Sequence, residues 1–227
     1  MGKLRKDNVF IVGDLHLPFE HRNYLEFCKE KQQKCKAATV IFVGDIVDNH
    51  AISYHEHDPD GWSPAEEMLH ADKHLKKWFK AFPTARICLG NHDSLVDRKA
   101  KTIGLPKRCF LPYRDIWGLL KTWRDDFEWA IDGVLYKHGT GMSGRYAHVM
   151  AAERARQSTV IGHTHSSLGV EYIVSSKDCI FGMNVGCGID RKKYAFAYGK
   201  DFPRKPALGC GVVTDKGKFA QVFAMDL

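Results

Sequence analysis

The sequence feature that most constrains the fold is a series of short apolar runs, each followed by a polar turn that contains glycine. The runs are residues 8–12, 39–43, 85–89, 134–136 and 159–161. Short apolar runs of this kind, bounded by turns, are typical of buried strands. Helical patterns lie between them, at residues 22–36, 64–82 and 145–156. The alternation of strands and helices predicts an α/β protein.

The start of the second helix carries the clearest local signal. Ser63 stands at the N-cap position, Pro64 at the first helical position, and Glu66 where a capping box requires an acidic residue. Residues 170–227 show only strand and turn signals, so we expect the chain to end in β-structure. Because the chain has 227 residues and no repeat or linker, we expect one domain over residues 1–227.

Each apolar run is followed by a motif rich in metal-binding side chains. In chain order the motifs are Gly13-Asp14-Leu15-His16, Gly44-Asp45-Ile46-Val47-Asp48, Gly90-Asn91-His92-Asp93, His138-Gly139 and Gly162-His163-Thr164-His165. One such motif alone would usually be just a turn. Open α/β sheets, however, carry their sites at the carboxyl ends of strands. Five motifs in order at five such ends therefore predict a metal site there.

These motifs resemble the D-x-H, G-D-x-x-D, G-N-H-[D/E], H and G-H-x-H pattern of the calcineurin-like metallophosphoesterase superfamily. The resemblance runs from Asp14 to His165, and residues 44–59 look most like its phage-encoded members. It implies a four-layer α/β/β/α sandwich of two mixed β-sheets flanked by helices, with the metal site at the carboxyl ends of strands. It also implies that the chain is a hydrolase that cleaves phosphoester bonds.

The resemblance further implies a role for each motif residue. One metal ion would be held by Asp14, His16 and His165, the other by Asn91, His138 and His163, and Asp45 would bridge both. A hydroxide that bridges the metals would attack phosphorus in line while His92 protonates the leaving oxygen. Asp93 would orient the His92 imidazole. Mixed Asp, Asn and His ligands suit Mn²⁺, our first expectation, and also Fe, Zn²⁺ or Ni²⁺, better than Mg²⁺.

The surroundings of the motifs bear on the substrate class. Phosphoprotein phosphatases of the superfamily carry an Arg after the second Asp of G-D-x-x-D and often another before G-N-H, to grip the phosphoryl group. This chain has Asn49 and Leu89 at those positions. Together with a net charge of +7 and a pI near 9.0, these departures favour a phosphodiesterase acting on a nucleic acid or nucleotide.

Two classes of alternative remain open. The first is a phosphomonoesterase or protein phosphatase of the same superfamily. The second is a protein without catalytic activity, either a nucleic-acid-binding protein whose metals only stiffen the fold or a relic site like that of a retromer subunit of similar fold. Relic sites tend to lose a ligand or the catalytic histidine, and this chain keeps all eight positions.

Substrate contacts are expected from three segments. Asp48, Asn49 and His50 begin a long polar loop that could overhang the metals. Gly141 and Ser143 belong to a glycine-rich turn whose backbone N–H groups either face a phosphate or serve only the turn.

The third segment is basic, covers residues 191–205 and begins at Arg191. Its interleaved aromatics fit single-stranded nucleic acid. The period-two alternation of Tyr194, Phe196 and Tyr198 favours a strand with one buried face instead. We interpret a second basic run, residues 98–108, as a solvated helix or loop face.

The remaining features concern the environment of the chain. The seven cysteines are odd in number and form no C-x-x-C pair, which is typical of reduced thiols in a cytosolic protein. The sequence has no run of 18 apolar residues and no signal-peptide pattern. We therefore expect a soluble cytoplasmic protein, in the host cytoplasm if phage-encoded, with its oligomeric state left open.

Overall fold

The computed structural model describes residues 4–54, 59–193 and 203–226. In these residues the first sheet has the strand order β11-β10-β1-β2-β3-β4. Its strands are β1 (Arg5–Val12), β2 (Ala37–Phe42), β3 (Ala85–Cys88), β4 (Trp123–Asp126), β10 (Gly209–Thr214) and β11 (Phe219–Ala224). Strands β1 to β4 run parallel, and β10 and β11 extend the sheet in antiparallel fashion.

The second sheet has the order β5-β6-β7-β9-β8. Its strands are β5 (Glu128–Ile131), β6 (Val134–Lys137), β7 (Thr159–Ile161), β8 (Leu168–Val174) and β9 (Cys179–Val185). Strands β6, β7 and β9 are parallel, while β5 and β8 are antiparallel edge strands. Both sheets are therefore mixed, and each contributes parallel strands whose carboxyl ends can carry the site.

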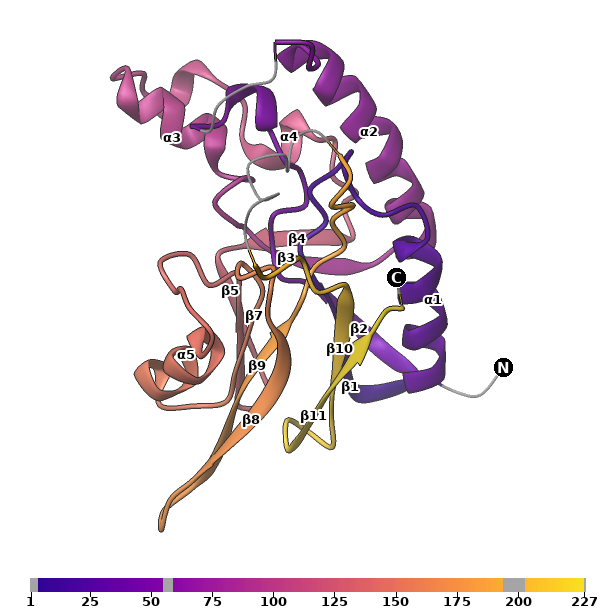
Figure 1. Ribbon diagram of the computed structural model, residues 1–227, viewed down its shortest axis with the longest axis vertical. Coiled ribbons are helices and arrows are strands. Elements are labelled where there is room, and N and C mark those ends of the chain that lie inside the picture. Colours follow the sequence, from indigo (N-terminus) through magenta and orange to yellow (C-terminus); the bar gives the residue numbers. More distant parts are fainter. Residues whose placement is uncertain (1–3, 55–58, 194–202, 227) are drawn as a thin grey trace.

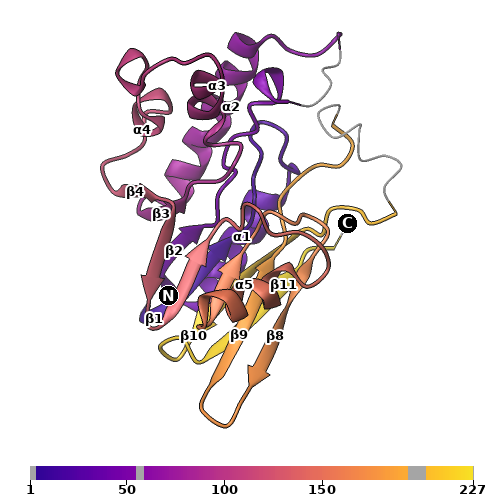
Figure 2. The same cartoon turned by 90° about the vertical axis from the view of Figure 1, so that its left-hand side faces the viewer.

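The helices form the outer layers. They are α1 (Tyr24–Cys35), α2 (Pro64–Ala81), α3 (Leu95–Thr102), α4 (Tyr113–Ile116) and α5 (Ala147–Ala155), with 3₁₀ turns η1 (His50–Ile52) and η2 (Lys107–Cys109). Helices α1 and α2 lie on one side of the strands and α5 on the other (Figure 1), and the turned view shows α5 in front of the second sheet (Figure 2). The predicted four-layer sandwich is confirmed. None of the helices in the described residues has the length and apolar character needed to cross a membrane.

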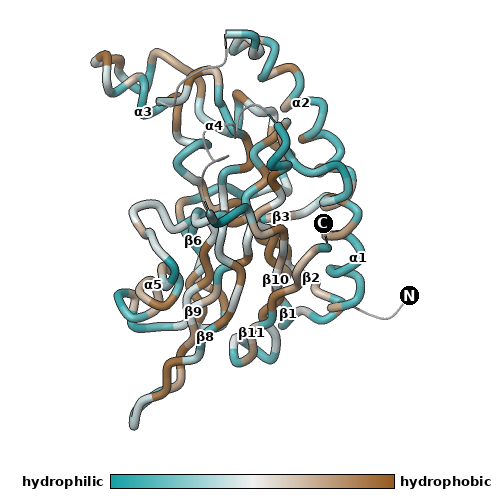
Figure 3. The backbone as a smooth tube through the Cα atoms, viewed as in Figure 1, coloured by the Kyte–Doolittle hydropathy of each residue, from teal (hydrophilic) through white to brown (hydrophobic). Residues whose placement is uncertain are grey.

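The two faces of β1 separate the two main parts of the core. Because side chains alternate along a strand, Val9 and Ile11 face the second sheet, where they pack in one cluster with Val160 and Met183. The residue between them, Phe10, faces the opposite way and joins the cluster beneath α1 and α2. The tube coloured by hydropathy shows the strands mainly brown and the outer helices largely teal (Figure 3).

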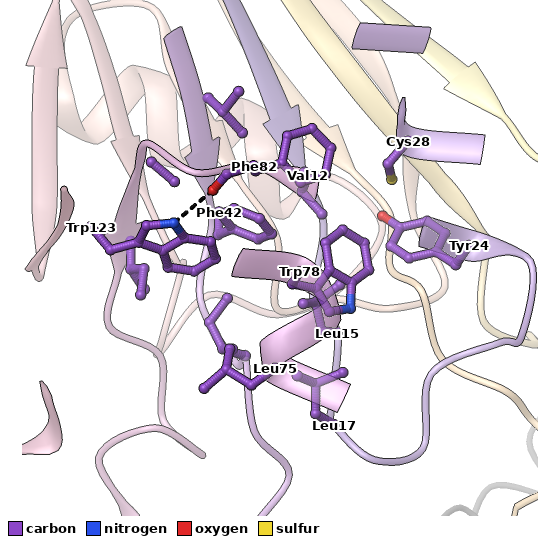
Figure 4. Close-up of a cluster of buried hydrophobic side chains, with 14 of the residues drawn as sticks. Val12, Leu15, Leu17, Tyr24, Cys28, Phe42, Leu75, Trp78, Phe82 and Trp123 are labelled. Atoms are coloured by element: carbon purple, nitrogen blue, oxygen red, sulfur yellow. Dashed lines mark hydrogen bonds between the residues drawn. The ribbon is translucent and has the colours of Figure 1, made fainter. Parts of the chain in front are cut away.

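The cluster beneath the helices is built from large aromatic side chains (Figure 4). Trp78 of α2 packs against Phe42 of β2 and Tyr24 of α1, with ring centroids 5.7 and 6.0 Å apart. Trp123 of β4 packs against Phe42 and donates its indole N–H to the Phe82 carbonyl at 2.7 Å. These contacts hold α1, α2 and β4 around β2, the strand that precedes the second motif.

Most of the predicted elements are present with small shifts at their ends. The five predicted strands correspond to β1, β2, β3, β6 and β7, and the tail forms strands as expected. The capping box at Ser63 and Glu66 is complete, which confirms the start of α2. The sequence did not predict α3, α4, β4 or β5, all of which are short. The alternating aromatics at 194, 196 and 198 and the histidines at 55 and 57 lie outside the described residues.

Candidate metal centre

The five motifs meet where strand ends of the two sheets come together. The first three follow β1, β2 and β3 of one sheet, and the last two follow β6 and β7 of the other. Two hydrogen bonds join loops of different sheets: His138 Nδ1–H donates to the Val43 carbonyl at 2.9 Å, and the His163 N–H donates to Asp14 Oδ2 at 2.9 Å. The packing of the two sheets therefore sets the spacing of the motifs.

A first cluster consists of Asp14, His16, Asp45 and His165, whose potential ligand atoms lie within 4.8 Å of one another. His165 Nε2 is 3.1 Å from His16 Nε2 and 3.2 Å from Asp14 Oδ2. His16 Nε2 is 3.7 Å from Asp45 Oδ2. These are the residues expected for one metal ion, with Asp45 at the edge of the group.

A second cluster shares Asp45 with the first and adds His138 and His163. His138 Nε2 lies 3.1 Å from Asp45 Oδ2, 3.1 Å from His163 Nδ1 and 3.0 Å from the Asn91 side-chain oxygen. The structure thus brings the seven predicted ligands into two adjoining groups. Asp45 is the residue common to both, which is the position that a bridging ligand would occupy.

The chemistry of these residues fits divalent metal ions. One carboxylate oxygen of Asp14 is buried with no hydrogen-bond partner within the described parts of the chain, as expected where a cation would satisfy it. The Nδ1 atom of His138 is engaged with a backbone carbonyl and that of His16 with Asp48 Oδ1 at 2.5 Å, so each ring leaves Nε2 for a metal. Donor atoms about 2.1 Å from one ion are roughly 3 Å apart at a right angle, which matches the spacing found.

Opposing charges dominate the electrostatics of the centre. Burial lowers the pKa of His138, but the Asp45 and Asp14 carboxylates outweigh burial and raise it to about 10. Burial and the neighbouring His138 lower the pKa of His163 to about 4. Burial raises the pKa of Asp45, but the surrounding histidines hold it well below its usual range. In the absence of metal, a protonated His138 therefore offsets part of the negative charge that a metal cation would otherwise offset.

His92 lies against the first cluster and is held by Asp48. Its Nδ1–H donates to the Asp48 carbonyl at 2.5 Å, and the same nitrogen is 3.3 Å from Asp48 Oδ1. Its backbone N–H donates to Asp45 Oδ1 at 2.8 Å, and its ring makes an edge contact with His16, with centroids 4.6 Å apart. Because Nδ1 is engaged, Nε2 is the ring nitrogen available for proton transfer.

Asp93 has a different place from the one expected. Its carboxylate accepts the backbone N–H groups of Ile46 at 3.0 Å and Gly90 at 2.9 Å, and the Tyr113 hydroxyl at 2.9 Å. It therefore ties the second motif to the third, while the His92 ring is oriented by Asp48. Burial and the Asp45 charge raise the pKa of Asp93 to about 6.

Two motif glycines allow the backbone to approach the carboxylates closely. A Cβ atom on Gly90 would lie 2.1 Å from Asp45 Oδ1, and one on Gly162 would lie 2.0 Å from Asp14 Oδ1. Neither carboxylate could keep its position next to a larger residue. The glycines of these motifs are thus required by the ligands that they face.

The residues expected to contact substrate fall in different places. Asn49 and His50 are buried, and Asn49 donates its side-chain N–H to the His92 carbonyl at 3.0 Å. Gly141 and Ser143 are exposed in the turn before α5, and Arg191 is exposed beside a pocket described below. No contact in the described residues tests a substrate role for any of them, so these roles stay predictions.

Arg98 of α3 is a cation near the centre that the sequence analysis assigned to a solvated face. Its Nη1–H donates to the backbone carbonyl of the predicted ligand Asn91 at 3.3 Å, and its guanidinium lies over the Tyr54 ring, 5.2 Å from the centroid. The chain has no Arg after Asp48 or before Gly90, so Arg98 brings positive charge to this region from another element. In the sequence, the only signal for this contact is that Arg98 follows Asn91 by seven residues.

Comparison with known proteins agrees with the fold and the motifs. The family model described as calcineurin-like phosphoesterase matches residues 8–179. The chain therefore belongs to the calcineurin-like phosphoesterase family. No match was found among the curated proteins. None of these comparisons bears on the resemblance to phage-encoded members, which stays a prediction.

Several solved structures are similar to the chain at low identity. Vps29 from Cryptosporidium parvum is 14% identical with a TM-score of 0.50, over 97% of this chain and 91% of that one. A metallophosphoesterase from Sphaerobacter thermophilus is 13% identical with a TM-score of 0.49, over 98% and 89%. Yfce, a phosphoesterase from E. coli, is 17% identical with a TM-score of 0.42, over 92% and 88%. At 14% identity the similarity to Vps29 supports the fold alone.

The glycine contacts predict that Gly162→Ala weakens metal binding. The added methyl group would displace the Asp14 carboxylate, so we expect Mn²⁺ affinity to fall by about 10–100-fold, as for other changes that misplace a ligand. Isothermal titration of the metal-free protein with Mn²⁺ measures this. Gly169→Ala is the matched control, since a Cβ there meets nothing within 4 Å. Equal affinities for the two variants would contradict the assignment of Asp14.

A second prediction concerns pH and Glu67, which anchors the segment after Asp48. Its carboxylate accepts the N–H groups of His50 and Ala51, each at 2.7 Å, and burial raises its pKa from 4.5 to about 7. Between these values the folded protein holds a proton that the unfolded chain has lost, so this contribution to stability falls as pH rises. The Glu67→Gln variant lacks this loss. The difference in free energy of unfolding between Glu67→Gln and wild type should therefore shift by about 1–3 kcal/mol in favour of the variant between pH 4.5 and 8.

Urea denaturation of the metal-free proteins across this pH range measures the gain. The exposed Glu153→Gln variant on α5 is the matched control, because it makes the same chemical change away from the site. A difference between wild type and Glu67→Gln that stays constant with pH would contradict the assignment.

Proposed function

We propose that this chain is a metal-dependent phosphodiesterase that acts on a nucleic acid or nucleotide and uses two divalent transition-metal ions, Mn²⁺ first among them. The observation that carries the proposal is the position of Asp45. Its carboxylate is shared by two clusters of metal-binding side chains, and it also accepts the backbone N–H of His92. Two metal ions and the imidazole of His92 would thereby be centred on one side chain.

In this proposal the ligands divide as the two clusters do. Asp14, His16 and His165 would hold one ion, Asn91, His138 and His163 the other, and Asp45 both. When bound, two such ions would activate water as a nucleophile and offset the charge that develops on the phosphoryl oxygens. The protein keeps the ligands fixed through backbone contacts to Val43, Gly90 and Gly162.

His92 would donate a proton from Nε2 to the leaving oxygen. Burial lowers the pKa of His92, but the Asp45 and Asp48 carboxylates outweigh burial and raise it above its ordinary value. The Asp48 carbonyl fixes the ring through Nδ1. A charged imidazole held in one orientation is suited to general acid catalysis.

Charge and the missing arginines support a diester substrate over a phosphoprotein. The net charge of +7 favours polyanions, and the arginines that phosphoprotein phosphatases place beside the phosphoryl group are replaced by Asn49 and Leu89. A monoester substrate and a purely binding role are the competing functions. The first experiment below separates these three functions.

The first experiment tests metal dependence. After chelation, Mn²⁺ should restore hydrolysis of bis(p-nitrophenyl) phosphate by the full chain, and Mg²⁺ should restore little. Asp45→Asn should abolish most of this activity, because it removes charge from both clusters together. Asp72→Asn, which makes the same change at a half-buried position of α2 where Asp72 pairs with Lys76 of the same helix, is the control.

Near wild-type turnover in Asp45→Asn would show that Asp45 does not bridge. Turnover of p-nitrophenyl phosphate alone would favour a monoesterase. The absence of turnover of either ester with Mn²⁺, Fe, Zn²⁺ or Ni²⁺ would favour a binding protein.

The second experiment tests the role of His92. An alkoxide leaving from a nucleotide diester needs a proton as the bond breaks, whereas p-nitrophenolate leaves without one. His92→Asn should therefore reduce turnover of a dinucleotide by about 10²–10⁴-fold and that of bis(p-nitrophenyl) phosphate much less, with metal content unchanged. Equal losses on the two esters would mean that His92 stabilises phosphoryl charge or positions substrate instead.

A further inference from the structure

A basic pocket of about 280 Å³ lies beside the first ligand cluster. Its walls carry the cationic side chains of Arg22, Arg191 and Lys192, and Ile189 and Leu208 form an apolar floor. Arg22 lies two residues before α1, whereas Arg191 and Lys192 follow β9. Two distant parts of the sequence thus bring positive charge to one place.

Backbone hydrogen bonds join the walls of this pocket to two predicted ligands. Gly188 donates its N–H to the Asp14 carbonyl at 2.7 Å and accepts the N–H of His21, also at 2.7 Å. On the other wall, Ala207 donates its N–H to the His165 carbonyl at 2.8 Å. Gly188 and Ala207 are covalently bonded to Ile189 and Leu208, which line the pocket, so the pocket is one residue away from the backbone hydrogen bonds to Asp14 and His165.

The positive charge of the pocket is not neutralised by any carboxylate in the described part of the chain. Across residues 4–54, 59–193 and 203–226, Arg22, Arg191 and Lys192 form no ion pair with a carboxylate. Among the described residues that line the pocket, the one acidic side chain is Asp190, which accepts the backbone N–H of Lys192 at 3.0 Å within its own turn. Three cations therefore remain available to an anion.

We propose that this pocket binds a second phosphate of a nucleic-acid strand, next to the phosphate that is hydrolysed. The inference rests on the proposed function, because it takes the two clusters to hold the scissile phosphate. Guanidinium groups bind phosphate oxygens in a bidentate manner, and Arg22 and Arg191 approach the pocket from different segments. The apolar floor would lie against the sugar. The preferred substrate is then a strand with at least two phosphates rather than an ester with a single phosphate.

The activity arm of the test compares thymidine dinucleotides with and without a terminal phosphate at the 5′ or the 3′ end. In the wild-type chain with Mn²⁺, a phosphate at one end should raise kcat/KM by about tenfold, the value of one good charge-assisted contact. Arg22→Ala/Lys192→Ala should lose this advantage. Lys121→Ala/Lys177→Ala removes the same charge from exposed positions before β4 and between β8 and β9, and should keep it.

Retention of the advantage by Arg22→Ala/Lys192→Ala would overturn the proposal, as would the absence of any advantage in wild type. Thermal unfolding of both double variants checks that each is folded.

A binding arm keeps the pocket testable if no ester is hydrolysed. Fluorescence anisotropy of a labelled oligothymidylate with the metal-free protein gives the slope of log affinity against log salt. Loss of one phosphate contact should flatten this slope by about 0.7 in Arg22→Ala/Lys192→Ala and leave it unchanged in the control variant. Equal slopes in the two variants would overturn the pocket assignment, whatever the outcome of the hydrolysis experiments.

Discussion

The burial of the Asp45 carboxylate is the constraint on which the site depends. The residue is 1% exposed, and burying a charged carboxylate is strongly unfavourable unless cations and hydrogen bonds compensate it. His138 at 3.1 Å and the backbone N–H of His92 at 2.8 Å provide part of this compensation. The remainder is what divalent cations would supply. Gly90 lies close to this carboxylate, and Asp93 accepts the N–H of Ile46, the residue after Asp45. Both contacts help to keep the Asp45 carboxylate in place.

A second consequence concerns the coupling of metal binding to the packing of the sheets. The ligands come from both sheets, and the bonds from His138 to Val43 and from His163 to Asp14 cross between them. The core between the sheets, which includes Ile11 and Val160, therefore determines how far apart the two halves of the site lie. Because binding energy becomes folding energy when ligands come from separate elements, metal should also stabilise the sandwich.

The sequence predicted the elements that carry strong local signals. Buried strands such as β7 and the capped helix α2 have such signals. The predicted ligands follow the strands at fixed positions. Contacts that depend on tertiary structure could not be predicted. Whether Asp48 or Asp93 orients His92 depends on how two loops fold against each other, and the structure gives this contact to Asp48. The placement of Arg22 beside Arg191 likewise requires the junction between α1 and the tail, which no local pattern encodes.

Diffraction at the manganese absorption edge tests most directly whether two metal ions share Asp45. Crystals of the full chain soaked in Mn²⁺ should give two anomalous peaks about 3.5–4 Å apart, with the Asp45 carboxylate between them. One peak should lie against His16 and His165 and the other against His138 and His163. A single peak, or two peaks that do not share Asp45, would contradict the account.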